Sequence, residues 1–207
     1  FAGYNVQTGV EPQGHFIMSN EATTDPNDLN QLKNCIEMAT EETGLVPEEA
    51  VADKGYGNMS QILDIEDNGI QCYVPLQSSS RDIEEEGGIV FEYDKSDDTY
   101  VCPQGKRLHL LQKNQRYGER ICNIYKCREC NGCPIRSSCT NSETGRIYKR
   151  DIEQERIGLY KEKLKSQYSK ERIAERKGIV EHPFGTIKWL MGKFQFLLIG
   201  KEKVQIE

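Results

Sequence analysis

The chain has 207 residues, 36% of them hydrophobic and 29% charged. This is enough for one substantial domain with an insert, or for two small domains. The longest apolar run, FQFLLIG at 194–200, is far shorter than the roughly 20 residues of a membrane-spanning helix. We therefore expect a cytoplasmic protein with no membrane partner. Because the chain opens on Phe1 without a signal-like stretch, we also expect a further segment upstream.

The net charge of −6 is unevenly distributed along the chain. Residues 1–100 contain 4 Lys and Arg against 21 Asp and Glu, whereas residues 101–207 contain 23 against 12. A polyanion such as a nucleic acid would therefore bind to the second half, where Lys and Arg can displace counterions from phosphates. Solvated basic helices would give the same distribution, and charge alone does not decide between the two interpretations.

The first 75 residues are predicted to fold in the order β-β-α-β-α-β. The expected elements are strands over 3–10 and 15–19, a helix from Asp25 to Gly44, a strand over 50–52, a helix over 59–69 and a strand over 70–75. A strand, a helix and a second strand in succession favour a parallel crossover. The order therefore predicts an α/β layer.

The remainder of the chain changes character twice. Residues 76–98 are predicted to be loop with a short strand over 89–93, and the cysteine-rich stretch 99–145 shows little periodicity. A charged helical segment over 151–177 and an apolar helix over 178–194 follow. We therefore expect three parts: an α/β part over 1–98, a cysteine-rich insert over 99–150, and a helical part over 151–207.

Asp53 is the first candidate functional residue. It follows the short apolar strand in the phrase VADKGYG. Open α/β sheets place ligands at the carboxyl ends of their strands, and carboxylate oxygens suit a hard cation. The alternative is a structural aspartate that caps the turn at Gly55.

Glu181, in the phrase RKGIVEHPFGTIKW, is the second candidate. Arg176 and Lys177 precede it and Lys188 follows it by two helical turns, so cations flank one carboxylate. Such an acid could bind a metal while its basic neighbours hold phosphates. An ordinary ion-paired helix is the alternative.

Six of the eight cysteines lie between Cys102 and Cys139. In a chain without a secretory signal, clustered cysteines are more often metal ligands than disulfides. Cys127, Cys130, Cys133 and Cys139 have spacings that suit a structural tetrahedral Zn²⁺ site, with free reduced cysteines as the alternative. Cys35 and Cys72 lie on apolar faces and are predicted to be core residues.

The order of several phrases resembles the bacterial insertion-sequence transposases with a DDE catalytic domain. These phrases are the opening FAGYNVQTGVE, then VADKGYG, IQCYVP, the cysteine-rich stretch and VEHPFGTIK. The resemblance implies an α/β fold with an RNase H-like mixed sheet flanked by helices and interrupted by the insert. It also implies three carboxylates that hold two Mg²⁺ ions for phosphoryl transfer.

By match to the motifs of this family, Asp53 is the second carboxylate and Glu181 the third. The first is expected on a strand upstream of the GYNVQ hairpin, so the polypeptide as given is expected to lack cleavage and strand-transfer activity. The hairpin strand ends in Glu11, where the family usually has Asp.

A Tyr-Arg-Glu-Lys signature accompanies the acid in many related transposases. Lys188 has the expected offset of seven residues from Glu181, whereas Arg176 stands one residue too far away and Lys177 occupies its place. The Tyr has no counterpart. The resemblance implies that Lys188 is a catalytic residue and that Arg176, Lys177 and Lys188 contact DNA.

The family pattern of cysteines selects Cys102, Cys130, Cys133 and Cys139 and leaves Cys127 out, so both sets of ligands stay open. The implied partners are DNA, as element ends and target, and a second copy of the chain, in the bacterial cytoplasm near the nucleoid. Two other interpretations remain: a noncatalytic zinc-ribbon-like module that binds nucleic acid, and a degenerate relic that keeps only the fold.

Overall fold

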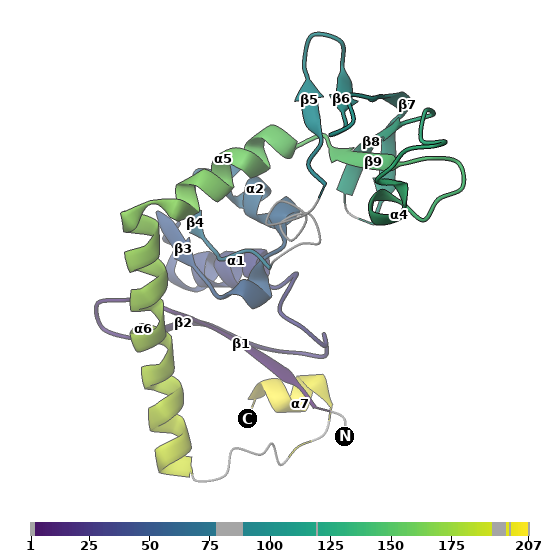
Figure 1. The fold of residues 1–207 in the computed structure, drawn as a ribbon. Coiled ribbons are helices and arrows are strands. Elements are labelled where there is room, and N and C mark those ends of the chain that lie inside the picture. The colour runs from purple at the N-terminus through teal and green to yellow at the C-terminus, as the bar shows by residue number, and fades with distance from the viewer. Residues whose placement is uncertain (1–2, 78–88, 119, 192–197, 199, 207) are drawn as a thin grey trace. The chain divides into compact units, whose positions relative to one another are not determined.

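A computed structural model describes residues 3–77, 89–118, 120–191, 198 and 200–206 (Figure 1). The chain divides into two compact units: unit 1 combines residues 1–77 and 159–207, and unit 2 comprises residues 78–158. These boundaries differ from those predicted at 98 and 150. The reason is that the strand beginning at Glu92 pairs with the strand beginning at Thr99, inside unit 2.

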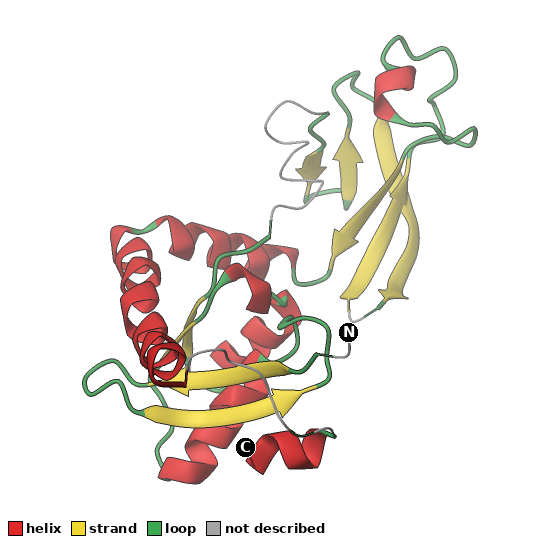
Figure 2. Ribbon diagram, turned by 90° about the horizontal axis from the view of Figure 1, so that it is seen from below, coloured by secondary structure: helices red, strands yellow, loops and turns green. Residues whose placement is uncertain are grey.

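Unit 1 opens with a β-hairpin made of β1 (Asn5–Val10) and β2 (Ile17–Thr23), which Figure 2 shows as two long antiparallel strands. The outer edge of β2 is covered by α7 (Lys201–Ile206). The side-chain amide of Gln205 accepts a hydrogen bond from the backbone N–H of Ala22 at 2.6 Å and donates one to the carbonyl of Asn20 at 2.9 Å. A side chain thus replaces a neighbouring strand on that edge.

Helix α1 (Leu32–Thr43) ends at Gly44, as predicted, but begins seven residues later than the predicted start at Asp25. Gly44 adopts the left-handed conformation, with φ of 70°, that ends many helices. The preceding residues form turns, in which Asp25 accepts a hydrogen bond from the side chain of Gln31 and Asn27 accepts one from the N–H of Leu29. Such local side-chain bonds compete with the helix and delay its start.

The parallel crossover predicted for unit 1 is confirmed. It consists of β3 (Glu49–Val51), a short 3₁₀ turn η1 (Lys54–Tyr56), α2 (Met59–Asp67) and β4 (Gln71–Tyr73), and β3 pairs with β4 in parallel. The side chain of Asn58 caps α2 by accepting from the N–H groups of Ser60 and Gln61. Ile62, Cys72 and Val74 have no solvent exposure and form the centre of the core.

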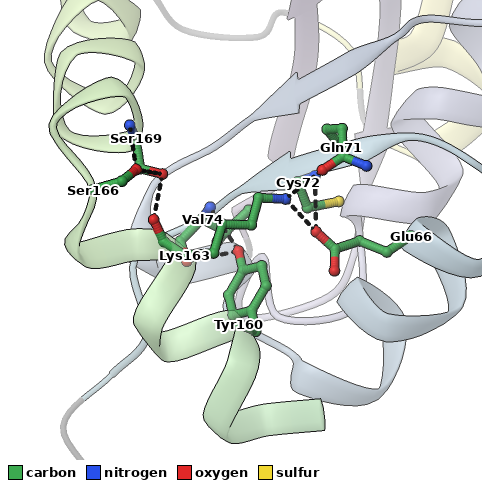
Figure 3. A network of polar contacts seen from close by, with 8 residues as sticks. All are labelled: Glu66, Gln71, Cys72, Val74, Tyr160, Lys163, Ser166 and Ser169. Carbon is green, nitrogen blue, oxygen red and sulfur yellow. Dashed lines mark hydrogen bonds and ion pairs between the residues drawn. The ribbon is translucent and has the colours of Figure 1, made fainter.

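Helices α5 (Gln154–Lys165) and α6 (Gln167–Met191) follow. The helical character predicted from composition is confirmed, but the two helices meet near residue 166 and not at 177, and the predicted residues 192–194 lie outside the described residues. In α5, Tyr160 exchanges two hydrogen bonds with the backbone of Val74, and Lys163 contacts the side chains of Glu66 and Gln71 (Figure 3). The hydroxyl of Ser169 then donates to the carbonyl of Lys163 at 2.7 Å, where α5 turns into α6. These contacts fix the start of α6 against the core of unit 1.

The predicted α/β class is confirmed, but the described strands of unit 1 form two separate pairs, β1 with β2 and β3 with β4. The RNase H-like arrangement in one mixed sheet therefore stays a prediction. No helix among the described residues is long and apolar enough to cross a membrane.

Unit 2 contains a five-stranded antiparallel sheet, although the sequence between 99 and 145 shows little periodicity. Its strands run in the order β5 (Glu92–Asp94), β6 (Thr99–Val101), β7 (Arg107–Tyr117), β8 (Arg120–Lys126) and β9 (Ile147–Asp151), with a short helix α4 (Arg136–Cys139). Most of β7 is exposed and polar, which conceals the alternation that would mark a strand.

The core of unit 2 is small and largely aromatic. It is centred on Tyr100, Leu108, Tyr125 and Cys127, and the rings of Tyr100 and Tyr125 meet edge to face at 5.1 Å. The hydroxyl of Tyr125 donates to the carboxylate of Asp98. Tyrosines can fill such a core because their polar ends reach a hydrogen-bond partner.

Candidate active site

Asp53 lies two residues beyond the end of β3, one residue further from the strand than the sequence predicted, and its two carboxylate oxygens have different partners. Oδ1 accepts a hydrogen bond from the N–H of Gly55 at 2.7 Å and caps the turn η1. Oδ2 lies 3.5 Å from Nη2 of Arg176. The Asp53 side chain is 48% exposed, so one oxygen is used locally and the other remains accessible.

Helix α6 runs alongside β3 and contacts the acids at its two ends. Tyr168 and Arg172 bind the carboxylate of Glu49, at 2.6 and 3.0 Å, and Arg176 reaches Asp53. From Tyr168 to Arg176 the helix rises ~12 Å, and from Glu49 to Asp53 an extended chain spans ~13 Å. The two spacings therefore match. Three polar residues spaced four apart on α6, namely Tyr168, Arg172 and Arg176, therefore align this helix with β3 and the adjoining Asp53.

A pocket of about 400 Å³ lies in unit 1 next to Asp53, lined by β1, α1, β3 and α6. Helix α6 contributes Arg176, Val180 and Phe184, which are spaced four residues apart and therefore share one face. Of the described residues that line the pocket, Arg176 is the only Lys or Arg. Four of them are carboxylates: Glu11, Asp28, Glu49 and Asp53.

Asp28 adjoins Asp53, and the sequence reasoning did not single it out. Its Oδ1 accepts hydrogen bonds from the side-chain amides of Asn5 at 2.6 Å and Gln7 at 2.7 Å. Its other oxygen, Oδ2, lies 3.3 Å from the point that a Cβ atom on Gly55 would occupy, and Oδ1 of Asp53 lies 2.8 Å from the same point. The two carboxylates are therefore close neighbours, and Gly55 leaves room for both. The alternate amides in the phrase NVQ were the only local sign of this contact.

Tyr56 connects this pair of acids to the hairpin. Its hydroxyl donates to the side-chain carbonyl of Gln7, which is almost fully buried. Burial raises the pKa of the Tyr56 hydroxyl, and the nearby carboxylates of Asp28 and Asp53 raise it further. The hydroxyl therefore stays protonated and serves as a fixed donor.

Glu181 lies on the same helix as Arg176, but not among the residues that line the pocket. Its side chain is 68% exposed, and its carboxylate lies 4.0 Å from the ammonium of Lys177, one helical turn earlier. Asp53 and Glu181 are thus each paired with a cation of α6. Lys177 is itself 75% exposed, whereas Arg176 is only 23% exposed because it faces Asp53.

The neighbour of Glu181 connects α6 to the turn of the hairpin. The ring of His182 lies 5.1 Å from the ring of His15, and His15 belongs to the turn between β1 and β2. The backbone of Lys188 belongs to α6, but its side chain lies outside the described residues.

The donor set at Asp53 fits a hard divalent cation. Carboxylate oxygens are the ligands that Mg²⁺ prefers, and the pocket has more acids than cations. Among the described residues, however, no three His, Cys, Asp or Glu side chains are arranged to hold a metal ion together. Asp53 can thus contribute to a metal site, but a complete one requires further ligands.

The predicted cysteine ligands all belong to unit 2. Cys102 follows β6, Cys127 follows β8, and Cys130, Cys133 and Cys139 lie between β8 and β9. Burial, together with the nearby thiols of Cys130 and Cys102, raises the pKa of the Cys127 thiol to about 11.

Cys139 is in the same electrostatic neighbourhood. Burial raises the pKa of its thiol, and Cys130, Cys102 and Cys133 act in the same direction. The backbone N–H of Arg146 donates to the sulfur of Cys130 at 3.4 Å. The five thiols are therefore neighbours. As they stand, however, no three of them are arranged around one metal position in the described part of the chain.

The fold and the site define an α/β protein with an acid at the carboxyl end of a parallel strand, where open α/β sheets place ligands. A family model described as "Transposase DDE domain" matches residues 101–207, just over half of the chain. The chain belongs to this family, as the resemblance predicted. The match includes Glu181 and the five clustered cysteines but not Asp53. Neither the curated proteins nor the solved structures include a match to the chain.

Proposed function

We propose that the chain is part of the catalytic core of a DDE transposase, which in its complete form cuts and joins DNA by metal-dependent phosphoryl transfer. Asp53 is the second carboxylate of the site and Glu181 the third. The position of Asp53 carries this proposal: it lies just beyond a parallel strand, exposes one oxygen, and lies against the helix that bears Glu181.

The first carboxylate in this proposal belongs to an additional strand that would lie beside β1 and β3 in space, with one of them on each side. This strand would complete an RNase H-like sheet. Both strands line the pocket along most of their length, whereas β2 contributes only Met18 and β4 contributes no residue. The edges of β1 and β3 that are not used for pairing with β2 and β4 therefore border the same space. A strand in that space would run next to Asp53.

Bound Mg²⁺ would supply the Lewis acidity that activates the attacking oxygen and stabilises the leaving one. The residues of this chain would hold the ion through Asp53 and Glu181 and place the DNA backbone against Lys177 and Lys188. Lys177 is exposed beside Glu181, which suits a contact to phosphate. We also propose that two copies of the protein act together on paired DNA ends.

Cleavage of DNA that carries the element ends tests this function in the complete protein. Asp53→Asn and Glu181→Gln should each reduce cleavage by about a thousandfold or more, because each removes a metal-binding charge. Asp64→Asn on α2 and Glu171→Gln on α6 change equivalent acids outside the proposed site and should leave it unchanged. Full activity of either Asp53→Asn or Glu181→Gln would overturn the proposal. An inactive wild-type protein would instead favour a degenerate relic.

A noncatalytic nucleic-acid-binding module with structural zinc is the second candidate, favoured by the cluster of five thiols in unit 2. In that case, chelation of the metal would abolish DNA binding while Asp53→Ala left it intact. DNA binding that survives chelation but is lost in Asp53→Ala would exclude it.

A further inference from the structure

The four carboxylates of the pocket differ in how firmly their charge is compensated. Glu11 accepts three backbone hydrogen bonds, from Gln13, Gly14 and Phe16, at 2.6 to 3.2 Å. Desolvation alone would raise the pKa of Glu11, but the three bonds together outweigh it, so the pKa lies below its ordinary value. The acid is thus fully engaged by its own turn.

Asp28 and Glu49 are also held by two partners each. Two side-chain amides bind Asp28 at 2.6 and 2.7 Å, and Glu49 receives a tyrosine hydroxyl at 2.6 Å and a guanidinium at 3.0 Å. Within the described part of the chain, the outer oxygen of Asp53 has a single partner, Arg176 at 3.5 Å. Among the described residues, Glu49 and Asp53 are the acids of the pocket that pair with an arginine of α6. The contact of Asp53 is the longer of the two, so its cation is the more easily exchanged.

The two arginines of α6 that face β3 are held to different degrees. Arg172 is bound by Glu49 at 3.0 Å and by Glu175 at 2.9 Å, so its guanidinium is fixed between two acids. Among the described residues, Arg176 has one acidic partner at 3.5 Å, and that partner, Asp53, has a side chain that is 48% exposed. Weakly held, partly exposed ion pairs are readily broken. Arg176 can therefore leave Asp53 without disturbing the contacts of Arg172 that align α6 with β3.

We propose that Arg176 is a gating residue, which occupies the cation position at Asp53 until a DNA phosphate draws its guanidinium away. Metal binding at Asp53 and DNA binding are then cooperative, since each favours the state in which Arg176 has left the carboxylate. A guanidinium forms strong bidentate hydrogen bonds with phosphate, which favours the exchange. This inference rests on the proposed role of Asp53 as a metal ligand.

Mn²⁺ is a suitable probe, because it accepts the same oxygen ligands as Mg²⁺ and broadens the NMR signals of nearby atoms. The backbone N–H of Gly55 donates to Asp53 and lies beside Asp28, so its signal reports on Mn²⁺ bound at or next to this pair of carboxylates, and the variants below separate Asp53 from its neighbour. Mn²⁺ is titrated into the complete protein, which also carries the first carboxylate of the proposed site, with and without a short double-stranded oligonucleotide. In the wild-type chain, the oligonucleotide should lower the Mn²⁺ concentration that broadens the Gly55 signal.

Arg176→Ala should lower this concentration about two- to fivefold without the oligonucleotide, as expected for the loss of one weak ion pair. The oligonucleotide should then have no further effect. Lys54→Ala is the matched control, because it removes an equal charge next to Asp53 without removing a contact to its carboxylate. It should preserve the effect of the oligonucleotide. An Arg176→Ala chain that behaves like wild type, or that keeps the oligonucleotide effect, would overturn the gate.

Asp53→Asn separates this inference from the proposed function. Loss of broadening in Asp53→Asn, together with an unchanged Arg176→Ala chain, would leave Asp53 a metal ligand and reject only the gate. Broadening of the Gly55 signal that persists in Asp53→Asn would reject Asp53 as a ligand, and the gate with it. The same NMR spectra show whether each variant is folded.

Discussion

The hydroxyl of Tyr160 donates to the carbonyl of Val74 at 3.1 Å and accepts from the backbone N–H of the same residue at 2.9 Å. Val74 directly follows β4 and is fully buried. One hydroxyl group on α5 thereby satisfies both polar backbone groups of a buried residue. The contact fixes the middle of α5 to the core of unit 1.

Tyr160→Phe should therefore lower the free energy of unfolding of unit 1 by about 1–3 kcal/mol, the cost of leaving buried backbone groups unpaired. Urea unfolding followed by circular dichroism measures the change. Tyr168→Phe is the control, since it also removes a hydroxyl that forms a hydrogen bond, but Tyr168 is 51% exposed and water can replace its bond to Glu49. A larger loss in Tyr168→Phe than in Tyr160→Phe would contradict this interpretation.

The sequence predicted those features of unit 1 that depend on neighbouring residues. The apolar segment before Asp53 became a strand, Gly44 ended α1, and the succession of strand, helix and strand gave a parallel pair. Each of these follows from local periodicity or from the conformation of one residue. The position of Asp53 at a strand end belongs to the same group.

Features that depend on distant residues were missed. The contacts of Asp28 join it to Asn5, Gln7 and Gly55, none of which is close to it in sequence. The pairing of Arg176 with Asp53 likewise depends on the packing of α6 against β3. Sequence spacing placed cations near Glu181 but could not show which acid each one would reach.

The stability of unit 2 is predicted to fall in acid because of Asp98. Hydrogen bonds from Tyr125 and then Tyr93 hold the pKa of this carboxyl below its ordinary value, against the effect of burial. The folded state then binds fewer protons than the unfolded state. The stabilisation is complete above the ordinary pKa of about 4 and is lost as the pH falls through the lower folded value.

Asp98→Asn should remove part of this pH dependence, and urea unfolding between about pH 2.5 and pH 6 measures it. Asparagine also tolerates the left-handed conformation of Asp98, whose φ is 48°. Asp97→Asn is the control, because Asp97 accepts no tyrosine hydroxyl and is paired instead with Arg107 on the surface. An unchanged acid dependence in Asp98→Asn would show that other carboxyls cause it.

Gly145 is predicted to be intolerant of any side chain. Its φ is 102°, and a Cβ atom there would lie 2.2 Å from the carbonyl oxygen of Cys127. Gly132 also has a positive φ, of 71°, but no atom lies within 4 Å of its Cβ position. Gly145→Ala should therefore lower the melting temperature clearly more than Gly132→Ala, which adds about 1–2 kcal/mol of backbone strain alone. Equal losses would contradict the close approach.

The clustered thiols of unit 2 lead to a prediction about zinc. A structural site with four thiolates should give one zinc ion per purified chain, measured by atomic absorption, and chelation should lower the melting temperature of unit 2. Cys130→Ser and Cys133→Ser should each abolish zinc binding, since both residues belong to either possible set of ligands. Cys35→Ser, in unit 1, is the control and should keep the zinc.

Cys102→Ser and Cys127→Ser distinguish the two sets. Cys127 is buried against Tyr100, Leu108 and Tyr125, so its thiol can serve as a core residue without a metal. Cys102 lies in the turn between β6 and β7, where the N–H of Gly105 donates to its carbonyl at 2.8 Å. We expect Cys102→Ser to lose zinc and Cys127→Ser to keep it while losing stability. The reverse result would place Cys127 in the site, and a wild-type chain without zinc would leave all five thiols as reduced cysteines.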